Sequence, residues 1–166
     1  MKIAFQMDPI EYVDIDADST FRLAEEAQKR GHDLYVYTPD DLTFNRGKIA
    51  AKVRSISLKR KIGDHVNFGA VELVDLCEFS VIWLRQDPPF DMGYITNTHL
   101  LDLVAKNTLI INNPFWVRNL PEKLLVLEFP DLIPDTVISR DLEEIKEFKR
   151  EFKDIIVKPL YGNGGA

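Results

Sequence analysis

The chain of 166 residues contains 45% hydrophobic and 29% charged residues, so it can bury one substantial hydrophobic core. This balance excludes an intrinsically disordered or fibrous protein. The formal net charge of −6 argues against a surface built as a whole to bind a polyanion. Any anionic ligand must therefore be held locally.

No segment near the amino terminus has the pattern of a secretory leader, and no apolar run is long enough to span a membrane. The single cysteine, Cys77, cannot form an internal disulfide, which is typical of a reducing compartment. We therefore expect a cytoplasmic protein that does not associate with membranes.

The amino-terminal part alternates strand and helix signals. Residues 3–7 and 34–37 predict buried strands, and between them Asp18 or Ser19 can cap a helix over 20–30 that ends at Gly31. This order predicts a βαβ unit and an open parallel sheet, whose carboxyl edge is the usual place for ligands. The pattern over 45–63 is weaker and indicates an irregular or edge hairpin.

Further strands are predicted at 80–84 and 109–111, on either side of a helix with one apolar face. That face carries Tyr94, Leu101, Val104 and Ala105. Asn113-Pro114 is expected to break the chain, and the Pro-rich stretch 113–134 marks a junction between two structural units.

Beyond the junction, Pro121 can begin a short helix over 122–127, because proline suits the first helical turn. Strands are predicted at 136–138 and 155–157. Between them, Asp141 and Glu144 resemble a capping box for a helix with one inward apolar face. That face carries Leu142, Ile145, Phe148 and Phe152.

The last eleven residues combine a lysine with a glycine-rich loop. Lys158 leaves an apolar segment and is followed by Gly162, Gly164 and Gly165. A lysine can meet phosphate oxygens, and glycines let backbone N–H groups approach a polyanion closely. The lysine precedes the glycines, so this is not the P-loop pattern. Taken alone, the segment fits either a nucleotide site or a surface turn.

Several short motifs follow one another along the whole chain. They are Met7-Asp8-Pro9, Asp18 to Phe21, Glu26 to His32, Arg85 to Asp91, Asn113-Pro114, Glu122 to Leu124 and Lys158 to Leu160. Together they resemble the bacterial glutathione synthetase family of the ATP-grasp superfamily. The resemblance implies an α/β fold: a pre-ATP-grasp substrate domain over 1–120, with an open, mostly parallel, Rossmann-like sheet, and the truncated start of an ATP-grasp nucleotide-binding domain over 121–166.

The activity implied by this resemblance is the ATP-dependent ligation of γ-glutamylcysteine and glycine through an acyl phosphate, giving glutathione, ADP and phosphate. ATP and Mg²⁺ are the implied cofactors. In this family the metal ligands lie further along the chain, so no metal ligand is assigned here and the 166 residues alone are expected to be inactive. Small-molecule substrates and a homo-oligomer are the implied partners.

The resemblance also implies site residues. Lys123 and Lys158 match the ATP-binding lysines, and Gly162, Gly164 and Gly165 match the loop that closes over the γ-phosphate. The alternative for Lys123 is a solvated helix lysine.

The run from Arg85 to Asp91 and the end of the first strand supply candidate substrate contacts. Arg85 could form a structural ion pair with Asp87 or Asp91, or hold a substrate carboxylate bidentately. Asp8 lies at the carboxyl end of the first strand, in a position that also suits a turn. We name Asp8, Arg85 and Asp87 as candidate substrate-binding residues.

Two other functions are considered. Another ATP-grasp carboxylate–amine ligase would carry the same lysine and glycine loop, and a non-catalytic α/β module could use the loop to bind an anion. Nucleic-acid binding is not expected, although a stretch without acidic residues carries Arg46, Lys48, Lys52, Arg54, Lys59, Arg60 and Lys61.

The remaining titratable candidates indicate no further chemistry. Cys77 is expected to be a packed core thiol, because its neighbours are apolar and no histidine is near it in sequence. His32, His65 and His99 lack metal-ligand spacing.

Overall fold

The computed structural model describes residues 1–161. The chain divides into two compact units, one over Met1–Asn119 and a second that begins at Leu120. Gly162, Gly164 and Gly165 lie outside the described residues.

The first unit is built on one mixed sheet in which, over residues 1–119, the strand order is β3-β4-β2-β1-β6-β7, with β5 on the other edge of β4. The strands are β1 (Lys2–Gln6), β2 (Asp33–Tyr37), β3 (Leu42–Asn45), β4 (Lys48–Leu58), β5 (Val66–Asp75), β6 (Val81–Leu84) and β7 (Leu109–Ile111). Strands β2, β1, β6 and β7 are parallel, as the βαβ order predicts. The antiparallel strands β3, β4 and β5 extend this parallel part.

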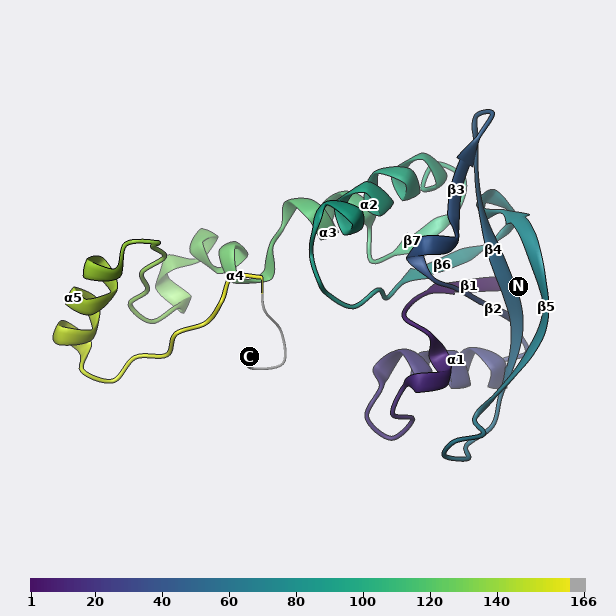
Figure 1. The fold of residues 1–166 in the computed structure, drawn as a ribbon, viewed down its shortest axis with the longest axis horizontal. Helices are drawn as coiled ribbons and strands as arrows, with labels where there is room; N and C mark the ends of the chain where they lie inside the picture. The colour runs from purple at the N-terminus through teal and green to yellow at the C-terminus, as the bar shows by residue number, and fades with distance from the viewer. Residues whose placement is uncertain (162–166) are drawn as a thin grey trace. The chain divides into compact units, whose positions relative to one another are not determined.

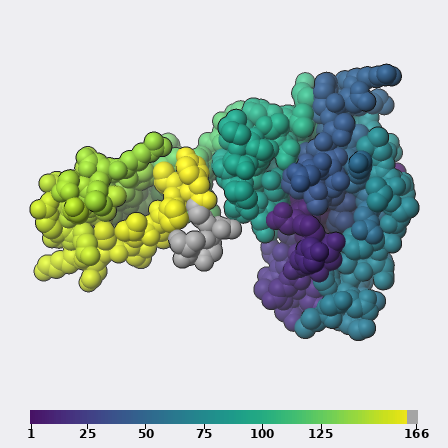
Figure 2. All heavy atoms as spheres, in the orientation of Figure 1, coloured from purple at the N-terminus to yellow at the C-terminus, as the bar shows by residue number. Residues whose placement is uncertain are grey.

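Strand β4 confirms the irregularity predicted over 45–63 and corrects the alternative of an edge hairpin. It pairs with β5 on one side and with β3 and then β2 on the other, so it is an internal strand. Its buried residues are first Ile49, Ala51 and Val53 and then, after a register shift, Ile56 and Leu58. The register shift moves the buried side chains of β4 from one face of the sheet to the other. The alternation of apolar and polar residues is therefore interrupted, and the strand pattern in the sequence is weaker than that of a regular strand. The tip of the β3–β4 hairpin projects from the body of the unit (Figure 2).

Helices α1 (Ser19–Lys29) and α2 (Met92–Val104) cover opposite faces of the sheet (Figure 1). Each begins at an aspartate cap: Asp18 accepts from the Phe21 N–H at 2.6 Å, and Asp91 from the Tyr94 N–H at 2.9 Å. Gly31, with φ +77°, follows the end of α1 as predicted.

Each face of the sheet has its own hydrophobic core. The core on the α1 face includes Ile3, Phe5, Phe21, Ala24 and Leu34. The core on the α2 face includes Ala4, Ile82, Leu84, Leu101 and Val104. The parallel strands are therefore held from both sides, which fixes the position of the residues that follow their carboxyl ends.

Helix α3 (Pro114–Asn119) completes the first unit, and it corrects the prediction that Asn113-Pro114 breaks the chain. Pro114 begins the helix instead, because its missing N–H costs nothing in the first turn. The Asn113 side chain accepts from the Trp116 N–H at 3.3 Å. An ion pair between Arg118 and Asp102 attaches α3 to α2.

The second unit contains α4 (Glu122–Leu125) and α5 (Leu142–Phe152), with 3-10 turns between them. Both helices lie where the sequence predicts them, and Asp141 caps α5. The strands predicted at 136–138 and 155–157 are wrong: these residues are in no strand of the structure. The apolar face of α5 is not an inward face either. Leu142 is 61% exposed, Phe152 is 38% exposed, and none of residues 120–161 is buried.

Candidate functional site

Arg85 follows β6 directly, and its side chain is held on the α1 side of the sheet. Its backbone N–H donates to the Gln6 carbonyl at 2.8 Å, which continues the pairing of β1 and β6. Its Nε donates to the Thr20 hydroxyl at 2.9 Å, and an Nη donates to the Ser19 hydroxyl at 2.7 Å. Both side-chain partners are neutral. The guanidinium is therefore oriented, while its charge is not matched by these contacts.

The structure does not contain the ion pair that was the alternative role for Arg85. Within residues 1–161, Arg85 has no carboxylate within salt-bridge distance. Asp91 caps the first turn of α2 instead, and Asp87 lies beside Asp8. An oriented guanidinium without an anionic partner can accept a ligand carboxylate bidentately.

Asp8 and Asp87 form the anionic side of the same sheet edge. Protein atoms around the Asp8 carboxyl remove part of its hydration, and the negative charge of Asp87 adds to this effect. Both influences raise the pKa of Asp8, while the backbone N–H of Asp87 partly opposes them. A cation bound near these two carboxylates would relieve their repulsion.

Tyr94, in the first turn of α2, lies within electrostatic reach of all three candidate substrate residues. Burial and the nearby Asp87 raise the pKa of its phenol, Arg85 lowers it, and Asp8 raises it again. Its hydroxyl donates to the Gln86 carbonyl at 3.4 Å. The structure thus brings Asp8, Arg85 and Asp87 together at the carboxyl edge of β1 and β6.

Gln6, the last residue of β1, is a member of this site that sequence reasoning missed. Its side chain is fully buried, and its Nε2 donates to the Gln86 Oε1 at 3.3 Å. Its own Oε1 has no hydrogen-bond partner among the residues that the structure describes. Buried polar atoms are normally paired, so an unpaired acceptor at this position is unusual. The signal that could have identified Gln6 is its position as a polar residue at the end of a mostly apolar strand.

The predicted nucleotide-binding residues belong to the second unit. Lys123 is the second residue of α4 and is half-buried, whereas Lys158 is exposed in the extended segment after α5. The five described candidates therefore fall into two sets: Asp8, Arg85 and Asp87 in the first unit, and Lys123 and Lys158 in the second.

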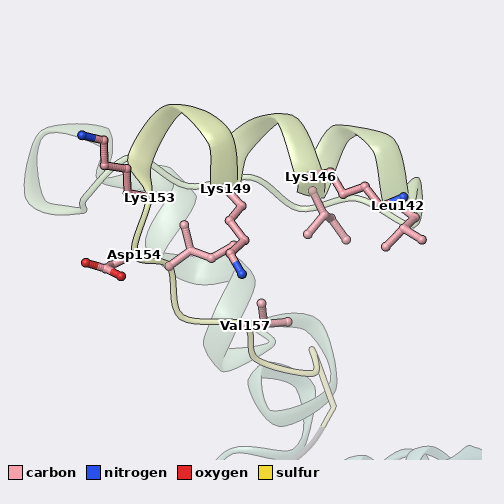
Figure 3. A pocket seen from close by; sticks show the side chains of 8 residues that line it. Leu142, Lys146, Lys149, Lys153, Asp154 and Val157 are labelled. Atoms are coloured by element: carbon pink, nitrogen blue, oxygen red, sulfur yellow. The ribbon is translucent and has the colours of Figure 1, made fainter.

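A groove of about 410 Å³ runs between α5 and the segment that follows it (Figure 3). Its apolar lining includes Leu142, Ile145 and Val157, and the Lys149 side chain extends from the helix toward the Val157 segment, whereas Lys153 points away. The groove contains Leu142 and Ile145 of the α5 face that the sequence predicted to be inward, but neither Phe148 nor Phe152. None of the predicted site residues lines it.

The described residues do not fit a magnesium site. Within residues 1–161, no group of three or more His, Cys, Asp or Glu side chains is arranged to hold a metal ion. Asp8 and Asp87 supply fewer oxygen ligands than Mg²⁺ normally takes from protein, substrate and water. No chemical step through a metal is therefore derived from these residues.

Most of the basic stretch 46–61 is paired with other side chains. Lys59 and Lys61 contact Asp64 at 2.8 and 2.9 Å, and Lys48 contacts Asp75 at 3.4 Å. Arg60 contacts Asp16, and Arg54 lies over the Phe68 ring at 3.7 Å. These contacts disperse the positive charge that the sequence concentrates.

The prediction of a packed core thiol is wrong for Cys77, which is exposed. A 3-10 turn over Leu76–Glu78 buries Leu76 and leaves Cys77 at the surface. The apolar neighbours in sequence therefore belong to the core while the thiol does not.

Among the described helices, none has the length and apolar character needed to cross a membrane.

The fold is that of an α/β protein in which charged side chains gather at the carboxyl edge of parallel strands. Residues 1–118 match the model of the prokaryotic glutathione synthetase N-terminal domain, and residues 122–166 match that of the prokaryotic glutathione synthetase ATP-grasp domain. The chain belongs to the prokaryotic glutathione synthetase family.

Individual relatives are similar along the whole chain. It is 55% identical over 166 residues to the glutathione synthetase of Brucella melitensis and 52% identical over 166 residues to that of Mesorhizobium japonicum. It is 37% identical over 167 residues to that of Vibrio parahaemolyticus. Each match covers 100% of this chain and 53% of the relative. The chain spans about half the length of the curated relatives that it matches.

Proposed function

We propose that this chain supplies the substrate domain and the first part of the nucleotide-binding domain of a glutathione synthetase. The enzyme joins γ-glutamylcysteine to glycine and converts ATP to ADP and phosphate. The observation that carries the proposal is the similarity to glutathione synthetases over the entire chain, at 55% identity to one of them. The site at the carboxyl edge of β1 and β6 supports it, because its charges suit a small zwitterionic substrate.

The reaction requires activation of a carboxylate. The γ-phosphoryl group of ATP passes to the cysteinyl carboxylate, forming an acyl phosphate and releasing ADP. The amine of glycine then attacks the acyl carbon, and phosphate leaves as the peptide bond forms. Mg²⁺ supplies additional neutralisation of phosphate charge when it is bound. Catalysis of this kind depends on positioning and electrostatic stabilisation.

In this proposal the two sets of residues have different tasks. Lys123 and Lys158 neutralise phosphate charge, and the backbone N–H groups of Gly162, Gly164 and Gly165 contact the γ-phosphate. Arg85, Asp8 and Asp87 hold the dipeptide. Exclusion of water from the closed site would protect the acyl phosphate from hydrolysis.

We also propose a domain boundary near residue 120, with domains over 1–120 and 121–166, a cytoplasmic location and a homo-oligomer. The boundary is supported by the change of structural unit after Asn119. It is also supported by the family matches, because the match to the N-terminal domain ends at residue 118 and the match to the ATP-grasp domain begins at residue 122.

The test is ADP release by the full-length protein that contains this chain, with ATP, Mg²⁺, γ-glutamylcysteine and glycine. Lys158→Met should lower kcat/KM for ATP by about 100-fold, since it removes one charge from the developing phosphoryl transition state. Lys106→Met removes an exposed lysine of the first unit and should leave kcat/KM unchanged.

The same assay separates the two alternatives. ADP release that depends on a different amine or carboxylate would indicate another ATP-grasp ligase. ATP binding without ADP release under any substrate combination would indicate a non-catalytic module. Either result would refute the proposed function.

A further inference from the structure

A buried histidine, His65, contacts the loop that connects β1 to α1. Its side chain is 5% exposed, and its Nε2 lies 2.7 Å from the Ile10 carbonyl oxygen. A carbonyl oxygen can only accept, so Nε2 carries the hydrogen and donates it. The other ring nitrogen, Nδ1, has no hydrogen-bond partner among residues 1–161. Within this part of the chain, the bond to Ile10 is therefore the one hydrogen bond that the ring makes.

His65 is itself held by the sheet and by α1. It lies directly before β5, and its carbonyl accepts from the Lys59 N–H at 2.9 Å, which continues the pairing of β4 and β5. Its ring meets the Phe21 ring edge-on, with 5.6 Å between the ring centroids. Phe21 is fully buried in the first turn of α1. His65 thus joins the antiparallel part of the sheet to the start of α1 and to the loop before it.

The loop that His65 contacts carries Asp8, two residues before Ile10. On one side of Asp8, the Met7 N–H donates to the backbone carbonyl of the last residue of β2 at 3.2 Å. On the other side, Pro9 has a restricted backbone, and Ile10 is 2% exposed with its carbonyl on His65. Asp8 therefore lies between two fixed points, and the second of them depends on His65.

The connection between β4 and β5 contacts the same loop at a second point. An Nη of Arg60 donates to the Ile15 carbonyl at 3.2 Å and contacts the Asp16 carboxylate at 3.1 Å. The Arg60 side chain is 44% exposed, and exposed polar contacts of this kind contribute little. Of the two contacts, the buried bond from His65 is the one expected to matter more for the position of the loop.

We propose that His65 is a positioning residue for the loop between β1 and α1. Its Nε2–H holds the Ile10 carbonyl and thereby fixes the carboxylate of Asp8, without contacting a ligand itself. This inference rests on the proposed function, in which Asp8 contacts the dipeptide. A residue that only fills the core would act through its shape, whereas His65 in this role acts through its hydrogen-bond donor.

Two substitutions separate the shape of the side chain from its donor. Gln carries an amide N–H donor close to the position of Nε2, and Met has a similar length and no donor. In the full-length protein that contains this chain, His65→Met should raise KM for γ-glutamylcysteine by about 5–10-fold, the effect of one lost hydrogen bond. It should leave kcat and KM for ATP within about 2-fold of the wild type, because binding of the dipeptide alone is weakened. His65→Gln should keep all three constants within about 2-fold of the wild type, since the donor is restored.

Two other variants serve as references. His99→Met makes the same change at an exposed histidine of α2 and should alter none of these constants. Arg60→Met should raise KM for γ-glutamylcysteine by a smaller factor than His65→Met, because its contacts are exposed. Circular dichroism and urea unfolding would verify that each variant is folded.

Hydrogen exchange in the loop tests the positioning role without turnover. The Tyr12 and Val13 amides donate within the loop, to the Pro9 and Ile10 carbonyls. In folded His65→Met these two amides should exchange faster than in the wild type, while the amides of β1 keep their protection. In His65→Gln the loop amides should exchange at the wild-type rate.

Two kinetic results would overturn the inference and leave His65 a packing role. One is a wild-type KM for γ-glutamylcysteine in folded His65→Met, and the other is an equal rise of this KM in His65→Met and His65→Gln. If the wild-type protein shows no ligase activity, the proposed function fails, and hydrogen exchange alone decides whether His65 holds the loop. If the ligase is active and the loop amides of His65→Met exchange at the wild-type rate, the positioning role fails alone.

Discussion

Gln28 connects α1 to the end of β4 through two reciprocal hydrogen bonds. Its Nε2 donates to the Leu58 carbonyl at 2.9 Å, and its Oε1 accepts from the Leu58 N–H at 2.6 Å. One side chain thus satisfies both backbone groups of a residue 30 positions away. We expect the substitution Gln28→Met, which preserves the length of the side chain, to destabilise the first unit.

The magnitude follows from the two bonds. Each intramolecular hydrogen bond contributes about 1 kcal/mol net, so the loss of both should lower the free energy of unfolding by about 2 kcal/mol. Both hydrogen bonds are only partly buried, so water can replace some of the lost bonding in the variant. The expected range is therefore about 1–3 kcal/mol.

Urea unfolding followed by far-ultraviolet circular dichroism measures this difference. Lys29→Met is the matched control, because Lys29 is the exposed neighbour of Gln28 on the same helix and the substituted residue is identical. The control should change the free energy of unfolding by less than about 0.5 kcal/mol. Equal effects of the two substitutions would refute the assigned role of the Gln28 bonds.

In a second variant, Gln28→Glu, we expect the free energy of unfolding to fall as pH rises. The protonated carboxyl of the new glutamate can donate to the Leu58 carbonyl as the amide does, whereas its carboxylate would face that oxygen and be repelled. The folded-state pKa of this glutamate should therefore rise above the unfolded value of about 4.3. Relative to the wild type, the variant should be nearly as stable below about pH 4 and should lose stability as pH rises through the folded-state pKa.

Two further predictions concern a buried and an exposed side chain. Tyr37→Phe should leave the free energy of unfolding unchanged or raise it by up to about 1 kcal/mol, because burial raises the pKa of Tyr37 and its hydroxyl has no partner among residues 1–161. Urea unfolding measures this, and a clear loss of stability would mean that the hydroxyl has a partner in solution. Cys77 should react with Ellman's reagent in the native protein at the rate of an exposed thiol, since it lies at the surface. A reaction that requires denaturant would contradict this placement.

The sequence predicts the parallel part of the sheet well because its signals are local. The strands β1, β2, β6 and β7 are short apolar runs, and the helix α1 has a cap and a terminal glycine. Strand β5 was not predicted. Val71 and Leu73 are exposed in it, so its pattern has no simple alternation of buried and exposed residues. Pairing with β4, a tertiary interaction, makes it a strand.

The two wrong strands of the second unit have a related cause. The apolar runs at 136–138 and 155–157 have strand composition, but a strand also needs a hydrogen-bonded neighbour. Within the described part of this unit, neither segment has one. Ile156 and Val157 are 84% and 72% exposed. Composition alone could not show that these segments lack a hydrogen-bonded partner strand.

The candidate site was predictable only in part. Asp8, Arg85 and Asp87 were named because they follow strands whose carboxyl ends meet at one edge. Gln6 was missed because its role depends on a contact with Gln86, 80 residues away. Tyr94 was assigned to an apolar helix face, and its position near the three charged residues follows from where α2 begins after β6.

The way in which Arg85 is anchored decides between the two roles that the sequence left open. An ion pair with Asp87 would orient the guanidinium but neutralise it before a ligand arrived, and a substrate carboxylate would then have to compete with a fixed one. Hydroxyls of Ser19 and Thr20 provide the orientation without the competing charge. Asp8 and Asp87 have each other as neighbours instead. A guanidinium without an anionic partner and two neighbouring carboxylates cost electrostatic energy in the free protein, and a ligand that carried both charges would recover part of this energy on binding.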